Sequence, residues 1–254
     1  MLLVLPVLVL TGACSASPVP VAEPPEVLAL RPEVIARLPH DADAFTQGLE
    51  LADGVLYEGT GLRGRSSLRA SDPDTGRVDE RVDLPADLFG EGITVVGDRI
   101  WQITWRDGVA VERDRATLAE LRRVSYDGEG WGLCHDGARL VMSDGSPELT
   151  FRDRTSFAET GRVTVTRDGT PVEELNELEC VGGAVWANVW QTDEIVRVDP
   201  ASGRVTAVAD LAALKPAGAS GVLNGIAAVP GTDEFLVTGK NWPTTFRVRL
   251  VGGP

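Results

Sequence analysis

The sequence predicts an all-β chain built as a ring of five repeated units, and three observations carry that prediction. Glycine (28) and proline (16) are frequent and 43% of the residues are apolar, which is typical of an ordered, turn-rich chain. Short apolar runs alternate with turn residues, and one set of runs returns every 40 to 47 residues. Short strands at such a spacing are typical of four-stranded antiparallel sheets around a central channel. We therefore expect a five-bladed β-propeller.

Each unit begins with a run that we expect to form the innermost strand of a blade. These runs start at Gln47, Glu91, Trp131, Glu177 and Asn224, which lie 44, 40, 46 and 47 residues apart. A turn and a second apolar run follow in every unit, at 55–57, 99–101, 139–141, 184–186 and 234–236. Third runs lie at 67–69, 109–111, 149–151, 195–197 and 246–248. In two units a tight turn comes next, where Gly76 and Gly203 suit the positive φ that such turns require.

The last unit ends at its third run, and this predicts how the ring closes. A strand-like run at 34–38 precedes the first unit and has no counterpart in the other units. We expect it to supply the missing outer strand of the fifth blade, which also covers an edge that would otherwise be open to aggregation. A two-sheet sandwich is the alternative for such a chain, but it does not predict the repeat. The propeller domain is expected to span residues 33–254.

The amino terminus is interpreted as an export signal. Residues 1–13 are apolar and uncharged and are too few to cross a bilayer as a helix, which needs about 20. Residues 10–14 resemble a bacterial lipobox, which predicts a signal segment 1–14 with lipidation of Cys14, followed by a tether over 15–32. The alternative is a plain secretory signal cut near Ala16. Either reading places the domain outside the cytoplasm, in the cell envelope, periplasm or medium.

The charge balance excludes some partners. The chain has 24 Lys and Arg residues against 38 Asp and Glu residues, a formal charge of −14. Phosphate contacts need a clustered cationic face, so we expect no nucleic acid and no membrane contact beyond a lipid anchor. The only lysines are Lys215 and Lys240 among 22 arginines. Nothing in the sequence requires more than a monomer.

Polar and aromatic residues converge on one rim of the predicted ring. The first two strands of a blade run antiparallel, so the start of one and the end of the next lie at the same rim. Strand starts bring Gln47, Glu91, Trp131, Asn176, Glu177 and Asn224 there, and strand ends bring Gly61, Trp105, Asp144, Trp190 and Lys240. Aromatics beside a few polar groups suit a small-ligand pocket. Trp101 and Trp186 lie one step further in and are expected to pack between blades.

With these positions identified, the chain resembles the plant- and bacterial-type glutamine cyclotransferases, a family of five-bladed propellers. The matching segments run in order through the repeat, at 45–49, 57–61, 89–93, 102–105, 129–133, 143–145, 175–179, 186–190, 223–227 and 238–243. The family converts amino-terminal glutamine of peptides or proteins to pyroglutamate with loss of ammonia, without catalytic zinc. With two histidines, His40 and His135, and no Cys/His cluster of zinc spacing, the sequence agrees with this metal-free type.

The resemblance and the residue types together predict roles for nine residues. Glu91 is expected to take a proton from the attacking amine and pass it to the departing nitrogen, although it could instead cap loop N–H groups. Gln47, Asn176 and Lys240 are candidate donors to the γ-oxygen, and Lys240 could alternatively pair with Asp144 or Glu177. The apolar walls are expected from Trp105, Trp131, Trp190, Phe45 and Phe89.

Further expectations concern the cysteines, calcium and other functions. Cys134 and Cys180 occupy the same position in neighbouring units, so they form either a disulfide or two buried thiols. No cofactor is expected, but Asp144, Glu177 and Glu179 could hold a structural calcium ion, which usually wants 6–8 oxygens. A non-catalytic binding propeller and a calcium-dependent lactonase are the alternative functions.

Overall fold

The computed structural model describes residues 26–253, which fold into 22 strands and one short 3-10 helix, Ala212–Leu214. The all-β prediction is therefore confirmed. Within this range no helix is long and apolar enough to cross a bilayer. The predicted signal segment 1–14, Cys14 and most of the predicted tether lie outside the described residues.

Three four-stranded antiparallel sheets follow one another along the first part of the repeat, each with its strands in sequence order. Their strands are β2 (Thr46–Ala52), β3 (Val55–Thr60), β4 (Ser67–Ser71) and β5 (Val78–Asp83); β6 (Gly90–Val96), β7 (Arg99–Thr104), β8 (Val109–Asp114) and β9 (Glu120–Ser125); and β10 (Leu133–His135), β11 (Leu140–Met142), β12 (Glu148–Arg152) and β13 (Glu159–Thr164). A small hairpin, β14 (Thr166–Arg167) and β15 (Thr170–Pro171), follows them.

The rest of the chain forms one sheet of eight strands. Its order is β16 (Leu175–Val181), β17 (Ala184–Val189), β18 (Glu194–Val198), β19 (Val205–Asp210), β1 (Leu28–Pro39), β22 (Thr244–Gly252), β21 (Glu234–Gly239) and β20 (Leu223–Ala228). As predicted, the amino-terminal strand pairs with the last strand, antiparallel from Leu30 to Pro39.

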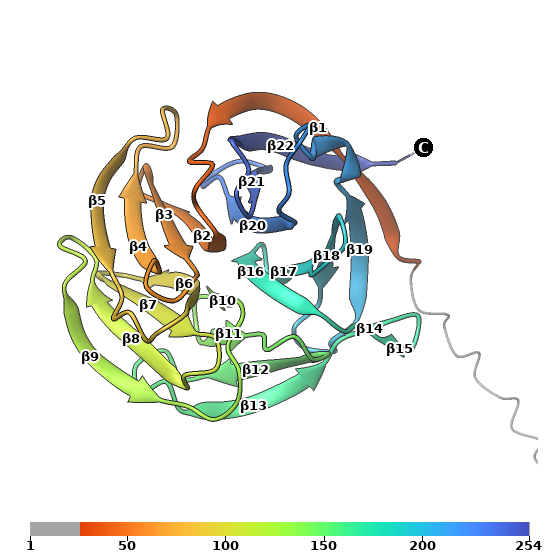
Figure 1. The fold of residues 1–254 in the computed structure, drawn as a ribbon. Helices are drawn as coiled ribbons and strands as arrows, with labels where there is room; N and C mark the ends of the chain where they lie inside the picture. Colours follow the sequence, from red (N-terminus) through yellow and green to blue (C-terminus); the bar gives the residue numbers. More distant parts are fainter. Residues whose placement is uncertain (1–25, 254) are drawn as a thin grey trace, which may run out of the picture.

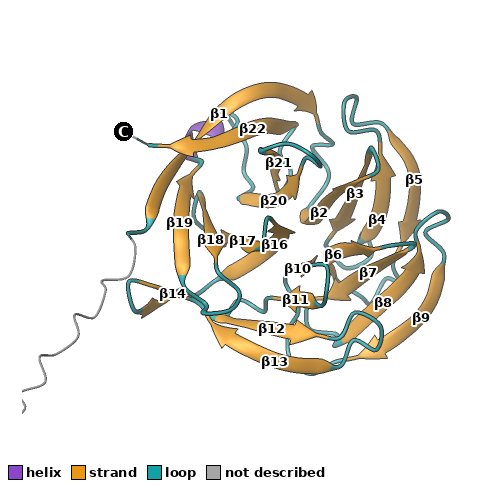
Figure 2. Cartoon of the chain, turned by 180° about the vertical axis from the view of Figure 1, so that it is seen from behind, coloured by secondary structure: helices purple, strands orange, loops and turns teal. Residues whose placement is uncertain are grey.

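The long strand β1 begins at Leu28, before the predicted run 34–38 and before the predicted domain start at residue 33, and it does more than close the last unit. Its first three residues, Leu28–Leu30, also pair in parallel with β19 of the preceding unit. Figures 1 and 2 show β1 between β22 and β19, so that two four-stranded halves become one sheet. The pairing satisfies backbone groups at the open edge of β19, which would otherwise face solvent.

The sheets are arranged radially around a common centre, which gives a propeller-like fold (Figure 1). The innermost strands are β2, β6, β10, β16 and β20, and each contacts the next, with β20 returning to β2. Apolar clusters fill the spaces between neighbouring sheets. Trp101 and Trp186 lie in two of these clusters, at 0% and 7% exposed, as the sequence predicted. Gly76 and Gly203 have φ of 67° and 72°, also as predicted.

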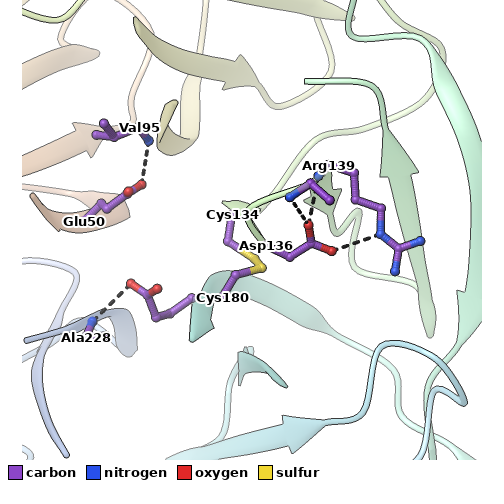
Figure 3. Close-up of a disulfide and its surroundings, with 9 residues drawn as sticks. Glu50, Val95, Cys134, Asp136, Arg139, Cys180 and Ala228 are labelled. Carbon is purple, nitrogen blue, oxygen red and sulfur yellow. Dashed lines mark hydrogen bonds and ion pairs between the residues drawn. A yellow bond between two sulfur atoms is a disulfide. The ribbon is translucent and has the colours of Figure 1, made fainter. Parts of the chain in front are cut away.

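A disulfide joins two inner strands on neighbouring sheets (Figure 3). Cys134 on β10 is bonded to Cys180 on β16, with 5.4 Å between the Cα atoms. Carboxylates link other inner strands. Glu50 on β2 accepts a hydrogen bond from Val95 N on β6 at 2.7 Å (Figure 3), and Glu179 on β16 accepts one from Ala228 N on β20 at 3.1 Å. The centre of the ring is therefore held covalently at one junction and by hydrogen bonds to half-buried carboxylates at others.

Candidate active site

All nine residues predicted for the site line one cavity of about 250 Å³. They are Phe45, Gln47, Phe89, Glu91, Trp105, Trp131, Asn176, Trp190 and Lys240, and Leu62 completes the lining. Gln47, Glu91 and Asn176 are the second residues of the inner strands β2, β6 and β16. Trp105, Trp190 and Lys240 directly follow second strands. The antiparallel pairing of these strands brings both groups to one rim, as the sequence predicted.

Glu91 is the buried carboxylate among the residues that line this cavity. Its side chain is 4% exposed, and one oxygen accepts a hydrogen bond from Gln47 Nε2 at 2.9 Å. Burial raises the pKa of Glu91 well above its usual range; the charge of Lys240 opposes that rise and Glu129 adds to it. No loop N–H donates to this carboxylate in the described structure, so it does not act as a cap. Glu91 is therefore a weakly solvated carboxylate that binds a proton readily.

The amide of Gln47 is itself oriented by a neighbour. Its Oε1 accepts a hydrogen bond of 3.4 Å from Asn224 Nδ2, which also donates to Thr46 O at 3.0 Å. With its oxygen engaged on β20, Gln47 turns its nitrogen toward Glu91. Asn224, which the sequence placed at the rim, thus lies behind the cavity wall and supports Gln47.

Lys240 is the one cation of the cavity lining, and it is 6% exposed. Burial lowers the pKa of its ammonium, and the charge of Glu91 opposes that shift. Nζ lies 4.9 Å from the centre of the Phe45 ring. Within residues 26–253 the ammonium has no hydrogen-bond or ion-pair partner at contact distance, so it is available to a ligand.

The alternative pairing of Lys240 with Asp144 or Glu177 is wrong. The Asp144 carboxylate accepts hydrogen bonds from the backbone and side chain of Ser146. Glu177 accepts from Leu49 N at 3.2 Å and from Ile226 N at 2.8 Å, and so joins β16 to β2 and β20. Burial raises the pKa of Glu177 well above its usual range. Its role is to link inner strands.

Asn176 brings an unsatisfied buried acceptor to the cavity. The residue is 3% exposed, and its Oδ1 has no hydrogen-bond partner within the described part of the chain. A buried polar atom without a partner costs about 1–3 kcal/mol, which a donor on a ligand can recover.

The aromatic walls form two groups of packed rings. Phe89 contacts both Phe45 and Trp105, with ring centres 6.3 Å and 5.5 Å apart. Trp131 and Trp190 pack edge to face with centres 5.4 Å apart. Half-buried and rigid, these rings can enclose the methylene groups of a small side chain.

Glu129 fixes two of these indoles, a role that sequence reasoning missed. Its carboxylate accepts hydrogen bonds from Trp105 Nε1 at 2.8 Å and Trp131 Nε1 at 3.0 Å. Arg106 binds the same carboxylate at 2.7 Å and lies over the Trp105 ring, 3.9 Å from its centre. Burial raises the pKa of Glu129, but the bonds from Trp131 and Arg106 outweigh this and leave it below its usual range. An acid two residues before a pocket tryptophan is the only sequence signal.

Asp144, Glu177 and Glu179, the predicted calcium ligands, do not form a cluster that could hold a metal ion. Across residues 26–253 no group of three or more His, Cys, Asp or Glu side chains is placed to hold one. The two histidines lie in different places. His40 is hydrogen-bonded to Glu58 at 3.1 Å and to Trp242 O at 2.6 Å, whereas His135 lies on β10.

Comparisons with known proteins agree with this geometry. Residues 5–250 match the glutamine cyclotransferase family. A glutaminyl-peptide cyclotransferase from Arabidopsis thaliana is 39% identical over 226 residues, which cover 86% of this chain and 71% of the plant protein. The crystal structure of Myxococcus xanthus glutaminyl cyclase is similar with a TM-score of 0.85 and 37% identity, covering 90% of this chain and all of the other. The chain therefore belongs to the glutamine cyclotransferase family.

Proposed function

We propose that this protein converts the amino-terminal glutamine of peptides or proteins to pyroglutamate and releases ammonia, with Glu91 carrying the proton. One observation carries the proposal: a buried carboxylate with a raised pKa and an ammonium without an ion-pair partner line the same aromatic cavity. At about 250 Å³ the cavity is below the roughly 300–1,000 Å³ of common ligand sites, which suits one residue rather than a longer segment.

The chemistry is intramolecular. The α-amine nitrogen of the substrate forms a bond to its own side-chain amide carbon, and the bond from that carbon to the amide nitrogen breaks. Holding the side chain curled in the aromatic cavity supplies much of the acceleration, because near-attack geometry replaces an encounter. Trp131 and Trp190 on one side and Phe89 on the other are placed to grip the methylene groups.

Glu91 balances the protons of the two steps. As a carboxylate it takes the proton that the attacking amine must lose, and as an acid it gives that proton to the departing nitrogen, which leaves as ammonia. A free α-amine has a pKa of about 8. Burial raises the pKa of Glu91 well above its usual range, so this carboxylate accepts the amine proton more readily than a solvated glutamate would.

The oxygen of the attacked amide becomes negative as the bond forms, and Lys240 is the donor best suited to it. Its ammonium is buried and has no protein partner in the described structure. The Asn176 amide is the second donor we assign, and its unsatisfied Oδ1 can accept from the substrate amine or amide. Gln47 already donates to Glu91, so we assign it to orienting that carboxylate rather than to the oxygen.

The direct test is incubation with the amide of Gln-Ala-Ala. We expect ammonia release and a mass loss of one ammonia, and expect both to persist in strong chelators because we propose a metal-independent reaction. Glu91→Gln keeps the shape and removes the proton carrier, so its turnover should fall about 10²- to 10⁴-fold. Full activity in Glu91→Gln, or loss of wild-type activity on chelation, would overturn this mechanism. Binding of the peptide without turnover would instead support a non-catalytic propeller.

We further propose that the three four-stranded sheets and the two halves of the eight-stranded sheet are five propeller blades. The contact ring of β2, β6, β10, β16 and β20 supports this count. An experimental structure with a different number of radial sheets would contradict it.

We also propose that the protein is exported, as a lipoprotein through Cys14, and acts as a monomer. The Cys134–Cys180 disulfide supports export, because disulfides persist in oxidising compartments. Labelled palmitate should enter the wild-type chain but not Cys14→Ser, and light scattering should give the mass of one chain. Soluble, unlabelled wild-type protein outside the cell would favour the plain secretory signal.

A further inference from the structure

A second cavity lies beside the candidate active site and shares two residues with it. Phe45 and Leu62 line both cavities. The second cavity measures about 280 Å³, and its charged lining residues are Asp41, Asp43, Arg65, Arg69 and Arg81. The apolar cavity for one residue therefore adjoins a polar one of similar size.

The wall between the two cavities is held by its own contacts. Leu62 has a φ of 84°, a left-handed conformation that costs a residue other than glycine about 1–3 kcal/mol. Its carbonyl accepts hydrogen bonds from Arg65 N and Ser66 Oγ, both at 2.9 Å. At Gly61 a Cβ atom would lie 2.5 Å from the Phe89 ring, so this ring packs directly on the loop backbone. The loop thus joins the aromatic wall to Arg65.

The charges in the second cavity are unequally paired. Arg69 binds Asp41 at 2.7 Å, which neutralises both. Arg81 binds Asp83 on the same strand at 2.7 Å and is 42% exposed, which leaves guanidinium donors free. Arg65 is exposed and makes no side-chain hydrogen bond or ion pair within residues 26–253. Asp43 is the lining acid without an ion pair. With three arginines against two acids, the charged lining residues carry one net positive charge.

We propose that this cavity binds a carboxylate that the substrate carries beyond its first residue, with Arg65 as the main contact and Arg81 beside it. The inference rests on the proposed function. If the first cavity takes only the glutaminyl residue, the rest of the peptide must leave it. An extended chain advances about 3.3–3.6 Å per residue, so a chain that leaves across Phe45 and Leu62 brings its second or third residue into the second cavity.

A carboxylate is the group that fits this lining best. The guanidinium fork matches the two oxygens of a carboxylate and binds them in parallel. Elsewhere the chain, with a formal charge of −14, repels anions, so a local cationic wall has most effect on acidic substrates. Two sources share this chemistry: the side chain of Asp or Glu after the glutamine, and the terminal carboxylate of a short peptide.

The experiment compares kcat/KM on the amides of Gln-Glu-Ala, Gln-Ala-Ala and Gln-Lys-Ala. We expect the wild-type protein to prefer Gln-Glu-Ala over Gln-Ala-Ala by about fivefold, the size of a good partly exposed ion pair. Arg65→Glu should reverse this preference. Arg154→Glu is the matched control, because it makes the same charge change at an exposed arginine in the β12–β13 turn, outside both cavities. Gln-Ala and its amide then separate the two sources, since only the former has a terminal carboxylate.

The outcomes separate the two proposals. If Gln-Ala-Ala amide is turned over but neither Gln-Glu-Ala amide nor free Gln-Ala is preferred, the carboxylate site is overturned. The proposed function then still stands. Equal effects of Arg65→Glu and Arg154→Glu would assign the peptide preference to the net charge of the whole protein, and this too would overturn the carboxylate site. A preference for Gln-Lys-Ala that Asp43→Asn abolishes makes the cavity a cation site instead. Absence of turnover on every peptide overturns the proposed function itself.

Discussion

The Gln47 side chain on β2 donates a 2.9 Å hydrogen bond to the carboxylate of Glu91 on β6, although 44 positions separate the two residues. The contact exists because neighbouring inner strands place equivalent residues side by side at one rim. It ties the amide of one sheet to the acid of the next, and Asn224 on β20 orients that amide from the other side. The proton-carrying group is thus positioned by three units of the repeat.

Replacement of Gln47 by Leu should move the acidic limb of the pH profile. The Gln47 amide stabilises the charged form of Glu91, so its loss should raise the pKa of that carboxylate beyond the rise that burial causes. Because the carboxylate form starts the reaction, kcat/KM falls as pH drops through this pKa. We therefore expect the limb of kcat/KM against pH to shift to higher pH in Gln47→Leu. A fall in rate with the limb unmoved would show that Gln47 serves another step.

Replacement of Glu129 by Gln should loosen the tryptophan walls. A glutamine cannot accept both indole N–H bonds and also hold Arg106 with a charge, so Trp105 and Trp131 gain freedom. We expect KM to rise about tenfold, the equivalent of ~1.4 kcal/mol, with a smaller change in kcat. Tryptophan fluorescence should change as well. Glu120→Gln is the control, because it removes the same charge from an exposed pair with Arg123 on β9. An equal rise of KM in both variants would contradict the positioning role.

Strand register explains why the site was largely predictable. Gln47 and Glu91 begin their units of the repeat, and Asn176 directly precedes the start of its own. Antiparallel pairing then places Trp105, Trp190 and Lys240 at the same rim. These consequences are local to each unit. No knowledge of how the units contact one another is needed to place such residues at a common rim.

The features that were missed depend on contacts between units or on backbone geometry. Leu62 reads as an ordinary apolar loop residue, and only its left-handed φ directs it into the cavity wall. Glu129 acquires its role from two indoles whose orientation no pattern encodes. The parallel pairing of Leu28–Leu30 with β19 joins segments that lie 179 positions apart in the chain, from Leu28 to Ala207. The distance between Cys134 and Cys180 was likewise open until neighbouring sheets were placed.

Stability should depend on pH through the carboxylate of Glu50. Burial raises its pKa from 4.5 to about 7, while the N–H of Val95 lowers it. The folded state therefore holds a proton that the unfolded state has lost, so this group stabilises the fold at low pH and that contribution disappears as pH rises from 4.5 to 7.

The variant Glu50→Gln has no such proton to lose. Its unfolding free energy relative to wild type should therefore increase by up to about 3 kcal/mol between pH 5 and pH 8, and its relative melting temperature should rise with it. Glu80→Gln, which removes an exposed acid of β5, is the control for the loss of one carboxylate. A flat difference for Glu50→Gln would contradict the buried proton.

Removal of the disulfide should lower stability more than activity. The bond between Cys134 and Cys180 spans 46 positions of the chain and joins β10 to β16 near the centre, whereas the cavity lies at the rim and includes neither cysteine. Closing a loop of this size in the unfolded chain stabilises a fold by roughly 4 kcal/mol.

The test uses the double variant Cys134→Ser and Cys180→Ser in a Cys14→Ser background. It should melt at a lower temperature than its parent, while its kcat/KM, measured well below the melting temperature, changes little. Reductant should lower the melting temperature of the parent to a similar value and leave the double variant unchanged. Two titratable thiols in the denatured, unreduced parent would show that the bond is absent, and a double variant as stable as the parent would show that it does not stabilise the ring.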